Sequence, residues 1–216
     1  MEEKTAAQLK RDALLHQKKN HYLRVGLVMT ALITLLAVVG AFWTPYEPTA
    51  IAGGAKFAAP SLGHLFGTDN FGRDIFSRVL YGARISLSVG FIAVGVALVS
   101  GGLLGAIAGF YGGRVDNVIM RCMDILLSIP SVLLALAIVA AFGTSVINLM
   151  IATGISTVPS YARLVRSSIL SIKDQEFVEA ARAVGTSDAV IITQHILPNC
   201  LAPILVQATF GVATAI

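Results

Sequence analysis

The chain has 216 residues, of which only 13% are charged and 56% are hydrophobic, with a net charge of +4. Soluble domains carry about 25% charged residues, and the apolar residues here fall in long blocks, which is typical of membrane spans. The basic residues flank these blocks, where positive charge sets orientation, so the basic pI of 9.3 does not indicate a partner nucleic acid. We therefore expect one integral, all-α membrane domain whose surroundings are the lipid bilayer.

The N-terminal part predicts a polar tail, residues 1–24, followed by a first span, residues 25–42. This uncharged run is just long enough to cross the roughly 30 Å hydrocarbon core as a helix. Val39-Gly40-Ala41 resembles a signal-peptide cleavage site, but the apolar run exceeds the usual length of about 7–15 residues. An uncleaved span is therefore favoured, with Trp43 and Tyr46 behind it as interfacial aromatic residues.

A long polar connection follows over residues 43–84, and its second half predicts an amphipathic helix. One face of that helix would be apolar, and an Asp74–Arg78 pair at i,i+4 would lie on the other. The apolar face consists of Ile75, Phe76, Val79 and Leu80.

Residues 85–216 predict a helical bundle with four more spans. The second span, 85–110, carries Gly101, Gly105 and Gly109 on one ridge, which favours close helix packing. The third lies within 118–142, where Pro130 predicts a kink that frees the Leu126 carbonyl. The fourth covers 146–161. The fifth begins near residue 201 and is expected to continue, with a sixth, beyond residue 216.

The positive-inside rule predicts the orientation of the spans. Twelve of the sixteen basic residues fall in the tail, in the 111–121 connection and in the 162–199 connection. These three segments lie on one side if the spans alternate, so the N-terminus and residues 176–199 are expected to be cytoplasmic, and 43–84 extracytoplasmic.

Residues 176–199, EFVEAARAVGTSDAVIITQHILPN, form an unusually long polar segment between two apolar blocks. Phe177, Ala180, Ala181 and Val184 recur at helical spacing and predict an apolar stripe. Gly185 follows where a helix end favours a left-handed residue, and a second short helix is expected to end at Pro198. Because the stripe is made of small residues, docking against protein is favoured over lying on lipid, which remains the alternative.

This segment resembles the EAA loop of ABC importer permeases. The resemblance rests on Glu179-Ala180-Ala181, on Gly185, and on Leu197-Pro198 at the consensus distances, although His195 replaces the consensus isoleucine. Residues 67–87, GTDNFGRDIFSRVLYGARISL, and 112–143 resemble the second membrane subunit of the dipeptide, oligopeptide and nickel permeases (DppC/OppC-like). The motif in the first of these stretches consists of Gly67, Thr68, Asp69, Gly72, Arg73 and Asp74.

The resemblance implies an ABC type I importer permease fold in the prokaryotic inner membrane. It implies a heterodimer with a second permease subunit, two cytoplasmic ABC ATPases, and an extracytoplasmic solute-binding protein. Residues 176–199 would be the coupling segment, in which Glu179 contacts the ATPase and Gly185 makes the elbow. The solute would be a di- or oligopeptide. Nickel or another small solute on the same scaffold, or a non-transport membrane scaffold, remain alternatives, and the residues of the substrate path are unknown.

The chain has no G-x-x-x-x-G-K-[ST] phosphate loop and no Gly-Lys pair, so ATP hydrolysis is expected in partner subunits. No catalytic constellation and no metal-ligand spacing of the histidines is visible, and neither an enzyme activity nor a cofactor is expected.

Polar residues near the spans have structural interpretations. Asp116 is expected to be the N-cap of the third span. Arg121 and Asp124, three residues apart near the interface, are interpreted as an ion pair or as side chains that snorkel to the interface. A local turn network is favoured for Asp69, Arg73 and Asp74. Cys122 and Cys200 are interpreted as small packing residues. Four polar residues could face the substrate path or bond between helices: Asn148, Thr153, Ser156 and Gln207.

Overall fold

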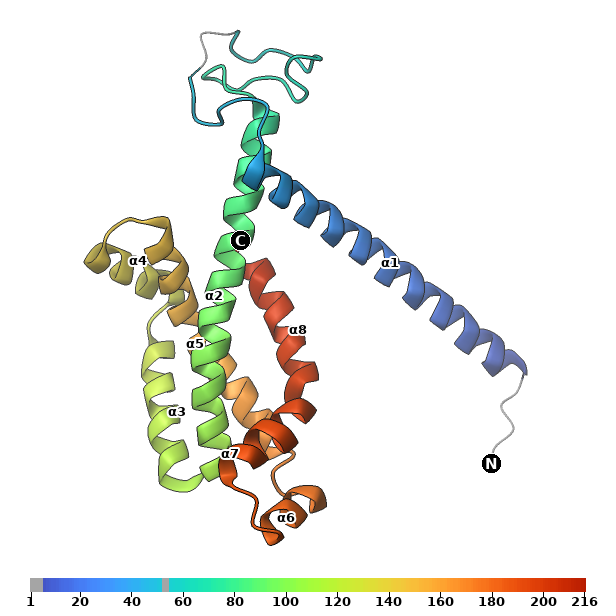
Figure 1. The fold of residues 1–216 in the computed structure, drawn as a ribbon, viewed down its shortest axis with the longest axis vertical. Helices are drawn as coiled ribbons and strands as arrows, with labels where there is room; N and C mark the ends of the chain where they lie inside the picture. Colours follow the sequence, from blue (N-terminus) through green and yellow to red (C-terminus); the bar gives the residue numbers. More distant parts are fainter. Residues whose placement is uncertain (1–5, 52–54) are drawn as a thin grey trace. The chain divides into compact units, whose positions relative to one another are not determined.

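The computed structural model describes residues 6–51 and 55–216, with side chains from residue 21 onward, and the described residues form helices and loops (Figure 1). The α-helices are α1 (Ala6–Phe42), α2 (Ile75–Tyr111), α3 (Gly113–Ser128), α4 (Ser131–Phe142), α5 (Val146–Leu170), α6 (Glu176–Ala183), α7 (Asp188–Val190) and α8 (Leu197–Ala215). A π-helix, η1 (Ile191–Ile196), joins α7 to α8. The chain divides into two compact units, Met1–Leu87 and Ser88–Ile216.

The first unit contains α1, the long connection and the first turns of α2. No break separates the expected tail from the expected span, because α1 is continuous through residue 24. Its apolar part, His21–Phe42, is long and apolar enough to cross a membrane. Near its end α1 crosses α2 closely: a Cβ atom on Gly40 would lie 2.3 Å from the Leu80 carbonyl oxygen.

The amphipathic helix expected in the connection is not separate from the second span. Both belong to α2, which runs unbroken for 37 residues. The four residues expected on one apolar face are not equally covered, because Leu80 is buried whereas Val79 is exposed. The prediction that Asp74 pairs with Arg78 along the helix is wrong. Asp74 precedes the helix, and its carboxylate accepts hydrogen bonds from the backbone N–H and the hydroxyl of Ser77, both at 2.7 Å.

Helix α5 lies at the centre of the second unit, in contact with α3, α4 and α8. The predicted glycine ridge of α2 packs directly on it. A Cβ on Gly105 would come within 2.3 Å of the Ala162 carbonyl oxygen, and one on Gly101 within 2.7 Å of the Val158 carbonyl oxygen. The small residues therefore allow backbone-to-backbone approach of the two helices, as expected of such a ridge.

The third predicted span is two helices bent by 88° at Ile129 and Pro130. The break is far larger than the expected kink, and the Leu126 carbonyl is not left free, since it accepts a hydrogen bond from the N–H of Ile129. Pro130 is the N-cap residue of α4, just before its first turn, where its missing N–H would have no intrahelical partner in any case.

Among the described residues, three helical segments are long and apolar enough to cross a membrane, or four if the bent α3–α4 pair is one span. They are His21–Phe42, Ile75–Tyr111 and Asp188–Ala215. The multi-pass helical architecture is thus confirmed. Helix α5, the expected fourth span, is less apolar than these three segments because it contains many polar residues. Its central position among other helices reduces its need for an apolar surface.

Candidate functional site

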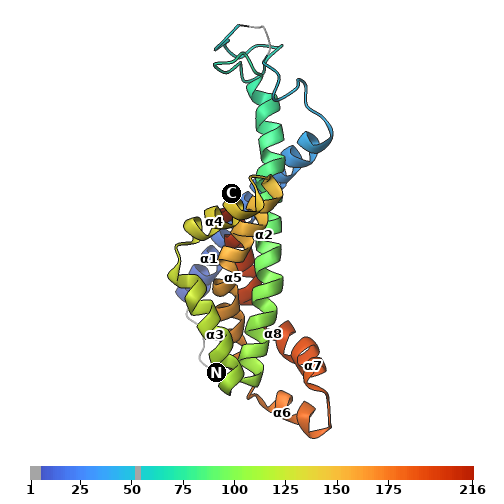
Figure 2. The ribbon, with the colours of Figure 1, turned by 90° about the vertical axis from the view of Figure 1, so that its left-hand side faces the viewer.

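The candidate coupling segment, residues 176–199, lies at one end of the second unit (Figures 1 and 2). Helix α6 ends in two backbone hydrogen bonds, from the N–H of Gly185 to the Arg182 carbonyl and from that of Thr186 to the Ala181 carbonyl. This pattern is a Schellman motif, which needs a left-handed residue in the position of Gly185. Gly185 has φ of 82°, so the glycine elbow expected from the sequence is present.

The inner face of α6 is sealed against the ends of other helices. Val178 and Ala181 are buried in one core cluster with Phe110 of α2 and Ile169 of α5. The guanidinium of Arg182 lies 5.1 Å from the centre of the Phe110 ring, a cation–π distance. Because α2, α5, α6, η1 and α8 all contribute to this cluster, the segment is firmly attached to the body of the unit.

The outer face of α6 is open, and it corrects the predicted stripe. Ala181 faces inward, whereas Phe177, Ala180 and Val184 are exposed, Val184 to 81%. The carboxylate of Glu179 is also exposed and makes no hydrogen bond or ion pair with any side chain in the described part of the chain. Helix α6 therefore presents two small apolar patches: an inner one already covered, and an outer one beside an unpaired carboxylate.

The second short helix was expected to end at Pro198, but it continues past that residue. Helix α7, η1 and α8 form one continuous run, with Pro198 in the first turn of α8, where a proline is tolerated. The wider π-helical turn places Ile196 in the buried core and leaves His195 half-buried at its edge. Ile196 thus occupies the buried position for which His195, its neighbour, would be unsuited.

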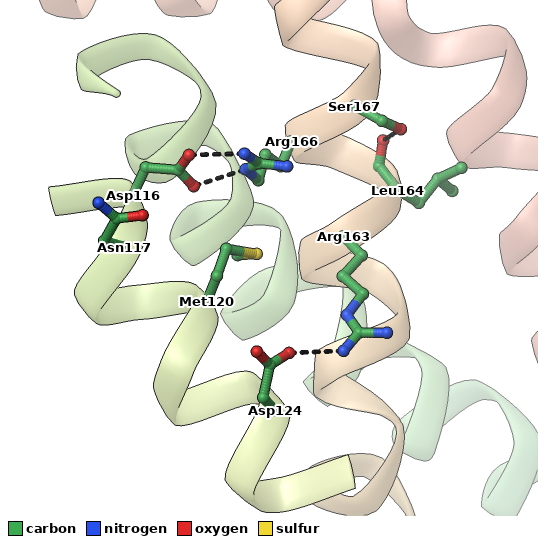
Figure 3. A pocket seen from close by; sticks show the side chains of 8 residues that line it. All are labelled: Asp116, Asn117, Met120, Asp124, Arg163, Leu164, Arg166 and Ser167. Atoms are coloured by element: carbon green, nitrogen blue, oxygen red, sulfur yellow. Dashed lines mark hydrogen bonds and ion pairs between the residues drawn. The ribbon is translucent and has the colours of Figure 1, made fainter. Parts of the chain in front are cut away.

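Two ion pairs join α3 to α5 (Figure 3). The carboxylate of Asp116 accepts from both Nε and Nη2 of Arg166, at 2.5 and 2.6 Å, and that of Asp124 accepts from Nη2 of Arg163 at 2.6 Å. The four side chains line a groove of about 570 Å³ with Met120 between the two pairs.

These pairs overturn two expectations. Asp116 is not an N-cap, since α3 begins at Gly113 and its N-cap residue is Gly112. Asp124 pairs with Arg163 of α5 and not with Arg121. The sequence contained a signal for this, because Asp116 and Asp124 are eight residues apart on one face of a helix, and Arg163 and Arg166 are three apart.

The external motif residues meet in one loop of the first unit. Thr68 is buried. Its hydroxyl accepts from the N–H of Ala58 and donates to the Ala55 carbonyl, which ties residues 55–58 to the loop that precedes α2. Gly67 and Gly72 both have positive φ, 74° and 76°. A Cβ on Gly67 would also meet the Ala58 carbonyl oxygen at 2.3 Å.

Asp69 and Asp74 hold this loop together, so the predicted local turn network is confirmed. Burial raises the pKa of Asp69, but hydrogen bonds from the backbone N–H groups of Arg73 and Phe71 and from the Arg73 guanidinium outweigh it and lower the pKa to about 2. Burial likewise raises the pKa of Asp74, and bonds from Ser77 and from Nδ1 of His64, at 2.9 Å, bring it below its usual value.

The polar residues considered for the substrate path mostly bond to backbone carbonyls. Thr153 donates to the carbonyl of Leu149 and Ser156 to that of Thr153, both within α5, whereas Asn148 of α5 donates to the carbonyls of Phe142 and Gly143 at the end of α4, a bond between two helices. Gln207 differs, because its side-chain amide makes no hydrogen bond among the described residues. Cys200 is buried, whereas Cys122 is exposed and does not pack as expected. Among the side chains that the structure describes, residues 21–51 and 55–216, no three His, Cys, Asp or Glu are grouped so as to hold a metal ion.

Comparison with known proteins gives consistent matches. Residues 101–216 match the family described as binding-protein-dependent transport system inner membrane component. The chain is 48% identical to the dipeptide transport system permease protein DppC of Alkalihalophilus pseudofirmus. The match covers 98% of this chain and 70% of that protein. It is 42% identical to the probable D,D-dipeptide transport system permease protein DdpC of Escherichia coli K12, in a match that covers 88% of this chain and 63% of that protein. It is 40% identical to the glutathione transport system permease protein GsiD from another E. coli strain, in a match that covers 92% of this chain and 66% of that protein. The chain thus spans about two thirds of the length of these relatives.

Proposed function

The chain belongs to the family of binding-protein-dependent transport system inner membrane components, and we propose that it is one of two membrane subunits of an ATP-driven importer of di- and oligopeptides. The observation that carries the proposal is the candidate coupling segment, whose inner face is sealed into the bundle while its outer face is open. The names of the relatives, which refer to dipeptides, D,D-dipeptides and glutathione, support a peptide solute.

In this proposal the outer face of α6 docks on a cytoplasmic ABC ATPase. Phe177, Ala180 and Val184 would supply a shallow apolar contact, and the carboxylate of Glu179 would meet a donor on the ATPase. A second permease subunit would complete the path, with one ATPase under each permease subunit, and a solute-binding protein would deliver the peptide from the side of the external loop. The N-terminus would be cytoplasmic. The distribution of basic residues supports this orientation.

Peptide uptake by cells that express the full transporter tests the proposal. Glu179→Lys reverses a charge that has no partner within the described residues, so the fold should be unaffected while uptake is lost. Gly185→Pro forces φ from 82° to about −65°, which is incompatible with the Schellman elbow. Both variants should be present in the membrane at normal levels.

Asp174→Lys is the matched control, since it makes the same charge change in the exposed turn before α6 but outside the motif. It should transport normally. Normal uptake by both Glu179→Lys and Gly185→Pro would refute the coupling assignment. Purification in mild detergent without any ATPase subunit would favour the membrane-scaffold alternative, and a cognate binding protein that retains nickel and no peptide would favour the nickel alternative.

A further inference from the structure

A second cavity, of about 200 Å³, lies between α2, α5 and α8 in the second unit. Ala93 and Val94 of α2 form its apolar wall, above a cluster in which Val94 and Ala97 contact Tyr161. The remaining lining residues are Thr153, Thr157, Ser160, Tyr161, Gln207, Gly211, Thr214 and Ala215. None of the lining residues carries a charge, yet most of those from α5 and α8 are polar.

All the hydroxyl groups in this cavity except that of Ser160 donate to backbone carbonyls and are left as acceptors. Thr157 donates to the carbonyls of Thr153 and Gly154, and Thr214 to those of Phe210 and Gly211. Each of these hydroxyls has used its one proton on its own helix, so only its oxygen lone pairs are available to the cavity. Tyr161 has likewise used its proton, on the backbone carbonyl of Gln207 at 3.2 Å.

Two further groups are uncommitted. The side-chain amide of Gln207 and the hydroxyl of Ser160 make no hydrogen bond among the described residues, although each lies on a helix that runs through the bundle. A polar group within a membrane protein is costly unless it bonds to protein, water or ligand. An amide at this position can donate to one carbonyl and accept from one N–H at the same time.

We propose that this cavity contacts the peptide bond of the transported solute, with Gln207 as the central contact and the hydroxyls of Thr157 and Ser160 beside it. This inference rests on the proposed function and adds a chemical selectivity to it. Neutral donors and acceptors match the backbone amide that all peptides share, and since none of the residues that line this cavity is charged, this contact should not depend on the charge of the peptide's side chains.

Glycine at position 211 keeps the cavity open. A Cβ atom there would lie 2.2 Å from the Tyr161 hydroxyl, so any larger residue must displace that hydroxyl from the Gln207 carbonyl. The small residue therefore sets both the width of the cavity and the position of the backbone that carries Gln207.

Initial uptake rates of a neutral, a cationic and an anionic dipeptide by the complete transporter test the proposal. Gln207→Leu and Thr157→Val remove hydrogen-bonding groups with little change in volume, and each should lower uptake of all three peptides by roughly two- to tenfold, the effect of one lost hydrogen bond. Gln207→Glu should raise the ratio of cationic to anionic uptake. Thr209→Val is the control, because Thr209 lies on the same helix, bonds to its own backbone and is outside the cavity.

Accessibility supplies a second measurement. In a Cys122→Ser background, a Ser160→Cys thiol should react with a small water-soluble thiol reagent, and excess peptide under turnover should slow the reaction. A thiol that stays unreactive would mean that another helix covers this face, which would overturn the proposal. Wild-type rates for Gln207→Leu and Thr157→Val in an active transporter would overturn it as well. A wild-type transporter that carries none of the three peptides would instead refute the proposed function.

Discussion

The two ion pairs between α3 and α5 allow a sharp prediction, because they are chemically alike and differ in geometry and burial. Asp116 and Arg166 form a two-bond pair with side chains that are 15% and 32% exposed. Asp124 and Arg163 form a single-bond pair with side chains that are 51% and 52% exposed. For each pair, three variants are compared with the wild type: Asp changed to Asn, Arg changed to Gln, and both changes together.

The pair of Asp116 and Arg166 should contribute more to stability. Two parallel hydrogen bonds between a guanidinium and a carboxylate are stronger than one, and partial burial reduces screening by solvent. We expect a coupling energy of about 1–2 kcal/mol from its double-mutant cycle. The exposed Asp124–Arg163 pair should give about 0.5 kcal/mol or less, as is usual for surface ion pairs.

Asp116→Asn alone should be the most damaging single change of the four. It leaves the Arg166 charge without its counter-charge, and Lys173 adds a second positive charge nearby. Removing one partner of a shielded pair costs more than removing both. The Arg166→Gln change in the same background should therefore restore part of the lost stability.

Unfolding of the purified protein in mixed detergent–SDS micelles, followed by circular dichroism, measures these differences. Equal coupling energies for the two pairs would show that geometry and burial do not distinguish them. A larger value for Asp124–Arg163 would contradict the reasoning outright. The charge swap Asp116→Arg with Arg166→Asp provides a control, since it preserves the opposite charges and should be more stable than either single reversal.

Two further predictions concern other parts of the chain. Gly105→Ala should destabilise the protein by about 1–3 kcal/mol in the same unfolding assay, because its methyl group would press on the Ala162 carbonyl. Gly102→Ala is the control: no neighbour lies within 4 Å, so it should be neutral or stabilising by up to about 1 kcal/mol. Equal effects of the two changes would refute the close contact of α2 and α5. The stabilisation of the external loop by Asp69 should be fully present above about pH 3.8 and be lost as the pH falls through about 2, because the pKa of this carboxyl is lower in the folded loop. Fluorescence of Trp43, the one tryptophan of the chain, should report that change, and Asp69→Asn should abolish it; an Asp69-dependent transition between pH 5 and 7 would contradict the assignment.

Local patterns in the sequence were sufficient for several features of the site. The Gly185 elbow follows from a rule about helix ends that depends on neighbouring residues only. The glycine ridge follows from spacing on one helix. Both predictions were confirmed because the interactions concerned are set by the backbone, and side-chain partners from elsewhere in the chain do not change them.

Features that depend on distant partners were not predictable in this way. The partner of Asp116 is Arg166, fifty residues further along the chain, and a rule about helix N-caps gave the wrong answer. The apolar stripe of α6 was predicted as one surface, yet Ala181 faces the bundle while Phe177 and Val184 face outward. Amphipathic spacing indicates that a helix has apolar faces, but it does not tell which of two partners covers each one.

The two faces of α6 have a mechanical consequence under the proposed function. A coupling helix transmits a displacement to the spans only if it is firmly attached to them. The inner face supplies that attachment, since Val178 and Ala181 share a core with α2, α5, η1 and α8, and close-packed interiors are hardly compressible. A displacement of α6 must therefore move the ends of these helices together. The cavity that contains Gln207 lies between three of the same helices, so a movement of their ends would change its width. The coupling segment and the solute contact would then belong to one packed unit. Gly185 would be needed for the shape of the segment and Ile196 for its attachment.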